Sequence, residues 1–114
     1  MATMEHVEAA LDIIRSASEM IGKMAAVEPS WQVGALAKLN ATDALLRATT
    51  DRFFLKTRAS LPPARKVQEQ AESLAGALAE PAPDVHKIGA SLEALERAVK
   101  ALDERSLMQG FTVT

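Results

Sequence analysis

The chain has 114 residues, of which 48% are hydrophobic and 25% charged, a composition typical of one soluble globular domain. Its formal net charge of −2 excludes a general basic field for nucleic acid, and the absence of cysteine excludes disulfides, thiolate metal sites and cysteine nucleophiles. The chain shows neither a basic start followed by an apolar leader nor an apolar run long enough to cross a bilayer. We therefore expect a cytoplasmic protein with no membrane partner.

Apolar residues repeat at spacings of three and four in segments that are separated by the five prolines. This period predicts four helices at about residues 4–27, 30–58, 63–80 and 84–108, followed by a non-helical tail at 109–114. Ser30 and Asp84 stand where N-caps are expected, and Gly110 stands where a glycine could close the last helix.

Each predicted helix carries one apolar line, and the lines give the expected core. They are Val7, Leu11, Ile14, Ser18, Ile21 and Ala25; Ala35, Leu39, Thr42, Leu46, Thr49 and Phe53; Val67, Ala71, Leu74 and Leu78; and Val85, Ile88, Leu92, Leu95, Val99 and Leu102. Amphipathic helices with short connections pack most simply as an all-α, antiparallel up-down-up-down four-helix bundle, here a single domain over residues 1–108. Trp31 is expected to cover one end of this core.

Apolar residues also occur away from the core line on the first two helices. Ile13 and Met20 widen the apolar side of the first helix, and the second carries a row of small residues opposite its core line, with Phe54 and Leu55 near its end. The row consists of Gly34, Ala37, Ala41, Ala44 and Ala48. Small residues in a row let another helix approach closely, so we expect a partner or a second copy to bind here, most simply as a homodimer. The alternative is that these alanines are exposed helix formers with no partner.

Basic residues concentrate between positions 47 and 66. This segment has six basic side chains and a single acid, Asp51, and its predicted anion-binding set is Arg52, Lys56, Arg58, Arg65 and Lys66. In the expected bundle, the acids near the start of the first helix and the end of the fourth share this corner and would neutralise it. Anion or nucleic-acid binding is therefore the second hypothesis for function, not the first.

His86 lies near the start of the fourth predicted helix, beside Lys87 and three residues before Gly89. This arrangement resembles part of the motif of histidine phosphotransfer domains, which are also small helical bundles, except that the glycine falls one position early and the lysine directly follows the histidine. The resemblance covers this one motif and implies phosphotransfer through His86 as a third hypothesis. The competing interpretation is a solvent-facing histidine in a first helical turn.

The sequence contains no convergent catalytic groups, no metal-ligand pair at helical spacing and no glycine-rich phosphate loop. We therefore expect no enzyme activity, cofactor or metal. The function that remains is a protein–protein interaction or assembly module, either a homo-oligomer or an adaptor, that uses the surface of the first two helices. A small apolar ligand held between the helices also stays open.

Overall fold

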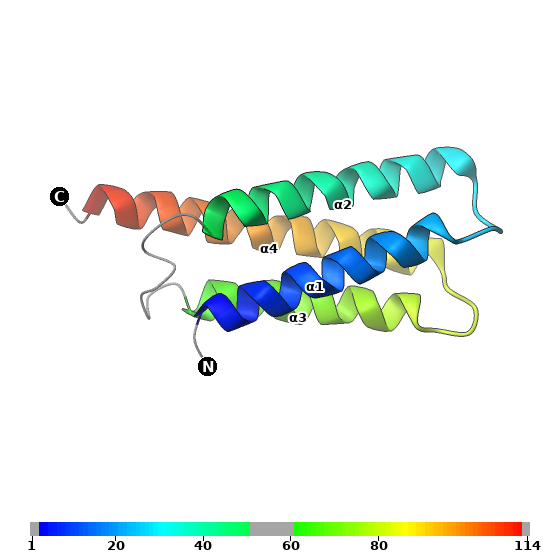
Figure 1. Ribbon diagram of the computed structural model, residues 1–114, viewed down its shortest axis with the longest axis horizontal. Coiled ribbons are helices and arrows are strands. Elements are labelled where there is room, and N and C mark those ends of the chain that lie inside the picture. The colour runs from blue at the N-terminus through cyan, green and yellow to red at the C-terminus, as the bar shows by residue number, and fades with distance from the viewer. Residues whose placement is uncertain (1–2, 51–60, 113–114) are drawn as a thin grey trace.

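The computed structural model of the chain describes residues 3–50 and 61–112. It contains four helices, α1 (Thr3–Gly22), α2 (Pro29–Thr50), α3 (Leu61–Leu78) and α4 (Val85–Thr112), and no strand within the described ranges. Successive helices run in alternating directions along one long axis (Figure 1). The predicted all-α four-helix bundle is confirmed.

The helices are ordered α1, α2, α4, α3 around the bundle. α1 packs against α2 and α3, and α4 packs against the same two helices, so that α2 and α3 lie across a diagonal. The molecule is thus two helical hairpins side by side, in which α1 runs parallel to α3 and α2 runs parallel to α4 (Figure 1). This order makes α2 and α4 neighbours along their whole shared length.

The core follows the predicted apolar lines closely. Buried residues recur at spacings of three and four on every helix, and the largest of them are Ile14, Ile21, Leu39, Leu46, Leu74, Ile88, Leu95 and Leu102. Thr42 and Thr49 belong to the buried line of α2 because each hydroxyl donates a hydrogen bond to the carbonyl oxygen four residues earlier, at 2.8 Å in both cases. Leu11 and Ser18 are only half-buried, and Ala25 lies outside the helix and is exposed.

The first helix ends at Gly22, five residues before its predicted end at Val27. Near this end, Nε2 of Gln32 in α2 donates to the carbonyl oxygens of Ile21, Gly22 and Met24 at 2.8, 3.2 and 3.2 Å. The Ile21 carbonyl also accepts from the Met24 N–H at 3.2 Å. A side chain of the next helix therefore caps the end of α1.

Other helix boundaries also differ from prediction, and α3 spans Leu61–Leu78 where 63–80 was predicted. The predicted N-cap Ser30 is wrong, because α2 already begins at Pro29, a residue suited to the first helical position since it needs no partner for an N–H. α4 continues to Thr112, into the predicted tail, and Gly110 lies inside the helix instead of capping it. A glycine ends a helix mainly by adopting positive φ, and no described glycine does so. Asp84 is confirmed as a cap, since its Oδ1 accepts a 2.9 Å hydrogen bond from the His86 N–H.

Candidate docking surface on α2 and α4

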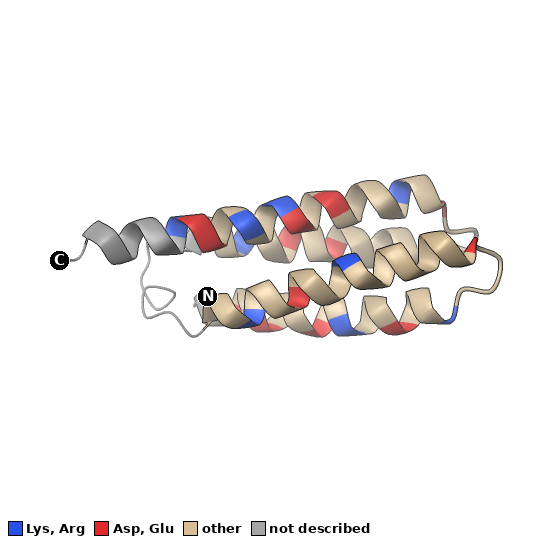
Figure 2. Cartoon of the chain, turned by 90° about the horizontal axis from the view of Figure 1, so that it is seen from above, with Lys and Arg blue, Asp and Glu red and all other residues tan. Residues whose placement is uncertain are grey.

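The outer face of α2 is exposed and almost free of charge. Ten of its residues are exposed and only Arg47 among them is ionisable; they are Pro29, Ser30, Val33, Gly34, Ala37, Asn40, Ala41, Ala44, Arg47 and Ala48. On α1, by contrast, exposed positions include Glu5, Glu8, Asp12 and Arg15. Figure 2 views the molecule from the side of α2 and shows this difference in the scarcity of coloured positions along the helix. A helix face without charge is unusual for a surface that meets only water.

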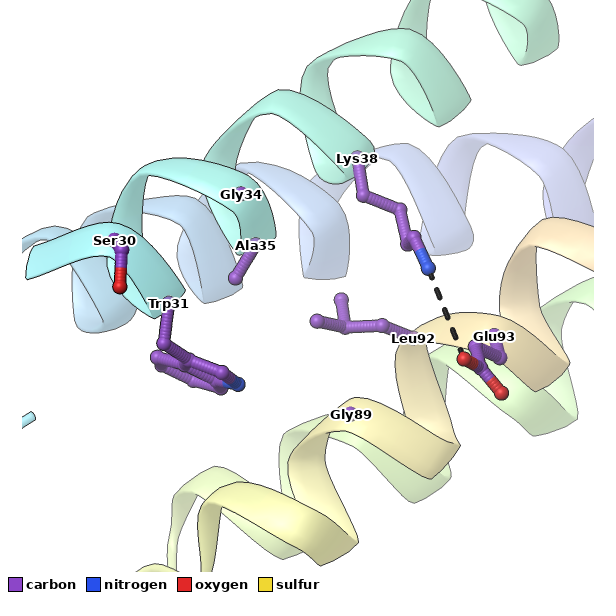
Figure 3. Close-up of a pocket in the computed structure, with 8 residues that line it drawn as sticks. All are labelled: Ser30, Trp31, Gly34, Ala35, Lys38, Gly89, Leu92 and Glu93. Atoms are coloured by element: carbon purple, nitrogen blue, oxygen red, sulfur yellow. Dashed lines mark ion pairs between the residues drawn. The ribbon is translucent and has the colours of Figure 1, made fainter. Parts of the chain in front are cut away.

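A shallow groove runs beside this face, between α2 and α4. It contains two hollows in succession, of about 360 Å³ near the start of both helices and about 220 Å³ farther along. Trp31, Ala35 and Leu92 supply apolar walls of the first hollow (Figure 3), and Leu45 and Val99 supply those of the second. Trp31 is half-buried and packs against the core, as expected, while part of its ring remains available to the groove.

Polar contacts cross the groove between the hollows and at its far end. Lys38 Nζ lies 4.0 Å from Glu93 Oε1, with side chains 34% and 60% exposed, so this ion pair adds little to stability and can be parted (Figure 3). Thr49 Oγ1 donates to Asp103 Oδ1 at 2.9 Å. At the outer edge of α2, Arg47 Nε donates to Asp43 Oδ2 at 2.8 Å, and this hydrogen bond, together with the Asp43 charge, raises the pKa of Arg47.

Two glycines face each other across the first hollow, Gly34 on α2 and Gly89 on α4. Neither has positive φ, and a methyl group placed on either would meet nothing within 4 Å. The fold therefore requires glycine at neither position, although glycine inside a helix is destabilising by about 0.5–1 kcal/mol relative to alanine. Because glycine has no side chain, these two residues leave open space beside the helix backbones at this end of the groove.

The residues predicted to bind a partner do not form one surface. Gly34, Ala37, Ala41, Ala44 and Ala48 all lie on the exposed face of α2, and Gly34 and Ala41 also line the groove with α4. Ile13 and Met20 are spaced seven and fourteen residues after His6, which contacts Gln68 of α3, so they belong to the α3 side of α1. Ile13 packs against the core, and Met20 is 40% exposed. Phe54 and Leu55 lie outside the described residues.

The basic corner is described only in part. Arg65 and Lys66 are exposed on α3, and neither makes an ion pair with any residue in the described ranges. Whether neighbouring acids neutralise this corner therefore stays a prediction. Arg52, Lys56 and Arg58 lie outside the described residues.

His86 is exposed in the first turn of α4, which agrees with the simpler of its two interpretations. Its neighbour Lys87 forms an ion pair with Glu80, and this hydrogen bond, with the charges of Glu80 and Asp84, raises the pKa of Lys87. The lysine is thus held on the connection between α3 and α4 and is not aimed at the imidazole. Within the described ranges, the His86 side chain makes no hydrogen bond or ion pair.

Sequence reasoning missed one buried polar group, His6, which is 5% exposed at the contact of α1 and α3. Its Nδ1 is hydrogen-bonded to Gln68 Oε1, and Gln68 Nε2 donates in turn to Glu72 Oε1 at 2.9 Å. Because the amide oxygen can only accept, Nδ1 carries the proton and Nε2 is a buried acceptor without a partner. His6 lies between Glu5 and Val7 in the sequence, and nothing local distinguishes it from an exposed histidine.

Metal sites, membrane spans and similar proteins also bear on function. In the described part of the chain, no group of three or more histidine and carboxylate side chains could hold a metal ion, and no helix there is long and apolar enough to cross a membrane. No known family, no curated protein and no solved structure matches this chain. The docking surface on α2 and α4 therefore has to be interpreted from its own geometry.

Proposed function

We propose that this chain is a non-enzymatic protein-interaction module that associates with a second copy of itself through the outer face of α2. The observation that supports this is the near absence of charge among the ten exposed residues of α2. Helix propensity explains exposed alanines, but it does not explain Gly34 or Val33, which is 67% exposed, because both residues are poorer helix formers than alanine. An uncharged row of small residues suits close helix packing better than solvation.

The proposed surface differs from the one expected from the sequence. It comprises α2 and the adjoining groove of α4, whereas Ile13 and Met20 of α1 lie on the opposite side of that helix from α2. The part of the sequence-based hypothesis that we retain is the row Gly34, Ala37, Ala41, Ala44 and Ala48.

The test is the solution mass measured by light scattering over a hundredfold range of concentration, for the natural chain and for Ala41→Arg. Ala41 is exposed and central in the row, so arginine leaves the folded monomer intact but places a charge in the middle of the interface. We expect a concentration-dependent dimer for the natural chain and association about a hundredfold weaker for Ala41→Arg.

The matched control is Ala101→Arg, an exposed alanine on α4 that lines neither hollow of the groove. It should dimerise as the natural chain does. A natural chain that remains monomeric over the whole range, or a dimer that Ala41→Arg leaves unchanged, would reject the proposal.

A further inference from the structure

The outer face of α2 is too small to hold two copies together by itself. A helix of 22 residues is about 33 Å long and roughly 10 Å wide, so this face offers about 330 Å² per copy. Stable interfaces bury about 800 Å² per partner. The second copy therefore has to contact more than α2. On the α1 side, α2 adjoins a hollow of about 230 Å³ lined by charged side chains that include Arg15, Glu19 and Asp43. The groove with α4, with hollows of about 360 and 220 Å³, is the more apolar of the two adjoining surfaces.

The direction of the second α2 follows from the spacing of the exposed row. Gly34 lies seven residues before Ala41 and Ala48 lies seven residues after it, with Ala37 and Ala44 between them. Turned end for end about Ala41, the row places Ala41 opposite its own copy and Gly34 opposite Ala48, while Ala37 and Ala44 come opposite Leu45 and Lys38. An antiparallel pair can thus place small residues against each other at its centre and at both ends.

The charges favour the same direction. Two parallel α2 helices in register would place Lys38 beside its own copy and Arg47 beside its own copy, and would align the two helix dipoles. In the antiparallel pair the two Arg47 side chains are twelve residues apart along the axis, about 18 Å, and the dipoles oppose. The Arg47 separation exceeds the screening length at physiological salt, which is about 8 Å. The two Lys38 side chains are six residues apart along the axis, about 9 Å, so both repulsions are weaker than in the parallel pair.

We infer that two copies pair with α2 antiparallel to α2 across a two-fold axis at Ala41, each α2 lying over the α2/α4 groove of the other copy. This inference rests on the proposed function and specifies its geometry. The C-terminal half of one α2, with Ala44 and Ala48, covers the first hollow of the other copy, where Gly34 and Gly89 leave room for a helix backbone. The interface is isologous and closed, so association stops at the dimer.

Because the chain has no cysteine, single-cysteine variants test this geometry directly. We would oxidise Ala41→Cys, Ala48→Cys, Gly34→Cys and an equimolar mixture of the last two under dilute conditions, and measure disulfide-linked dimer on a non-reducing gel and by mass spectrometry. A disulfide requires Cα atoms roughly 4.4–6.8 Å apart. Ala101→Cys, exposed and outside the groove, gives the background of random collision.

The antiparallel dimer predicts that Ala41→Cys links to itself and that Gly34→Cys links to Ala48→Cys in the mixture. Ala48→Cys alone should stay at the background of Ala101→Cys, because its two copies are about 21 Å apart along the axis. Self-linking of Ala48→Cys as efficient as that of Ala41→Cys would establish a parallel pair and overturn the inference.

The result also separates this inference from the proposed function. If light scattering shows a dimer but no α2 cysteine links above background, another face forms the interface and the geometry proposed here is wrong. If light scattering shows only monomer, the proposed function fails, and this geometry fails with it.

Discussion

A single atom, Nε2 of His6, is the least satisfied polar group of the described core. It is buried between α1 and α3, while Nδ1 of the same ring is hydrogen-bonded to Gln68. A buried acceptor without a donor costs about 1–3 kcal/mol, whereas an apolar side chain of similar size at the same place has no such penalty. His6 therefore makes the contact between α1 and α3 less stable than an apolar side chain would. The hydrogen bond between Nδ1 and Gln68 reduces this cost.

Replacing His6 with leucine should raise the free energy of unfolding by about 1 kcal/mol, because it removes the unpaired acceptor and leaves Gln68 able to turn to water. Urea denaturation measures this change. Gln68→Leu is the comparison, and it should lower the free energy of unfolding, since it leaves both ring nitrogens of His6 without partners. A His6→Leu variant that is less stable than the natural chain would show that Nε2 has a partner in solution.

At the scale of the helix, glycines are the residues whose presence the fold does not explain. Gly34, Gly76 and Gly89 all lie within helices, none has positive φ, and each has open space where a methyl group would be added. Intrinsic helix propensity therefore favours alanine at each of the three positions. They differ in surroundings, because Gly34 and Gly89 line the first hollow of the groove and Gly76 is exposed on α3.

Alanine at each of these three positions should raise the free energy of unfolding by about 0.5–1 kcal/mol, as thermal or urea denaturation of the monomer would measure. The variants should differ in association. Gly34→Ala and Gly89→Ala narrow the first hollow of the groove, which the proposed second copy would cover, and should weaken dimerisation. Gly76→Ala should leave dimerisation unchanged. Equal dimerisation in all three variants would mean that no backbone approaches these glycines.

At the scale of the whole molecule, the order of the helices creates the candidate docking surface. α2 and α4 are neighbours because the two hairpins pack side by side, and the groove between them exists only in this arrangement. α4 has 28 residues and α3 has 18, so the end of α4 extends past the other helices (Figure 1). The packing of the α1–α2 hairpin against the α3–α4 hairpin thus decides which helices are in contact.

If the folded molecule is a dimer, its thermal midpoint must depend on protein concentration, since dilution favours the unfolded monomers by mass action. A hundredfold increase in concentration should raise the midpoint by on the order of 5 °C for a chain of this size. Scanning calorimetry or circular dichroism at both concentrations measures it. The midpoint of Ala41→Arg should depend less on concentration, and a concentration-independent midpoint for the natural chain would contradict the dimer.

The sequence by itself determined the number of helices, their approximate bounds and most of the large side chains that they bury. Leu39 and Leu46 of α2, and Leu74 of α3, were placed in the core correctly because helical periodicity is local and shows which side of a helix is apolar. The same locality identified the small residues opposite the core line of α2, whose exposure the structure shows.

Only the tertiary structure decided which helices meet. The apolar line of a helix shows that it is buried but not against which partner, so Ile13 and Met20 could be assigned to the α2 surface although they lie toward α3. Gln32 of the next helix caps the end of α1, and His6 is hydrogen-bonded to Gln68, 62 residues away. Contacts of this kind arise from packing between distant segments, which leaves no periodic signal in the chain itself.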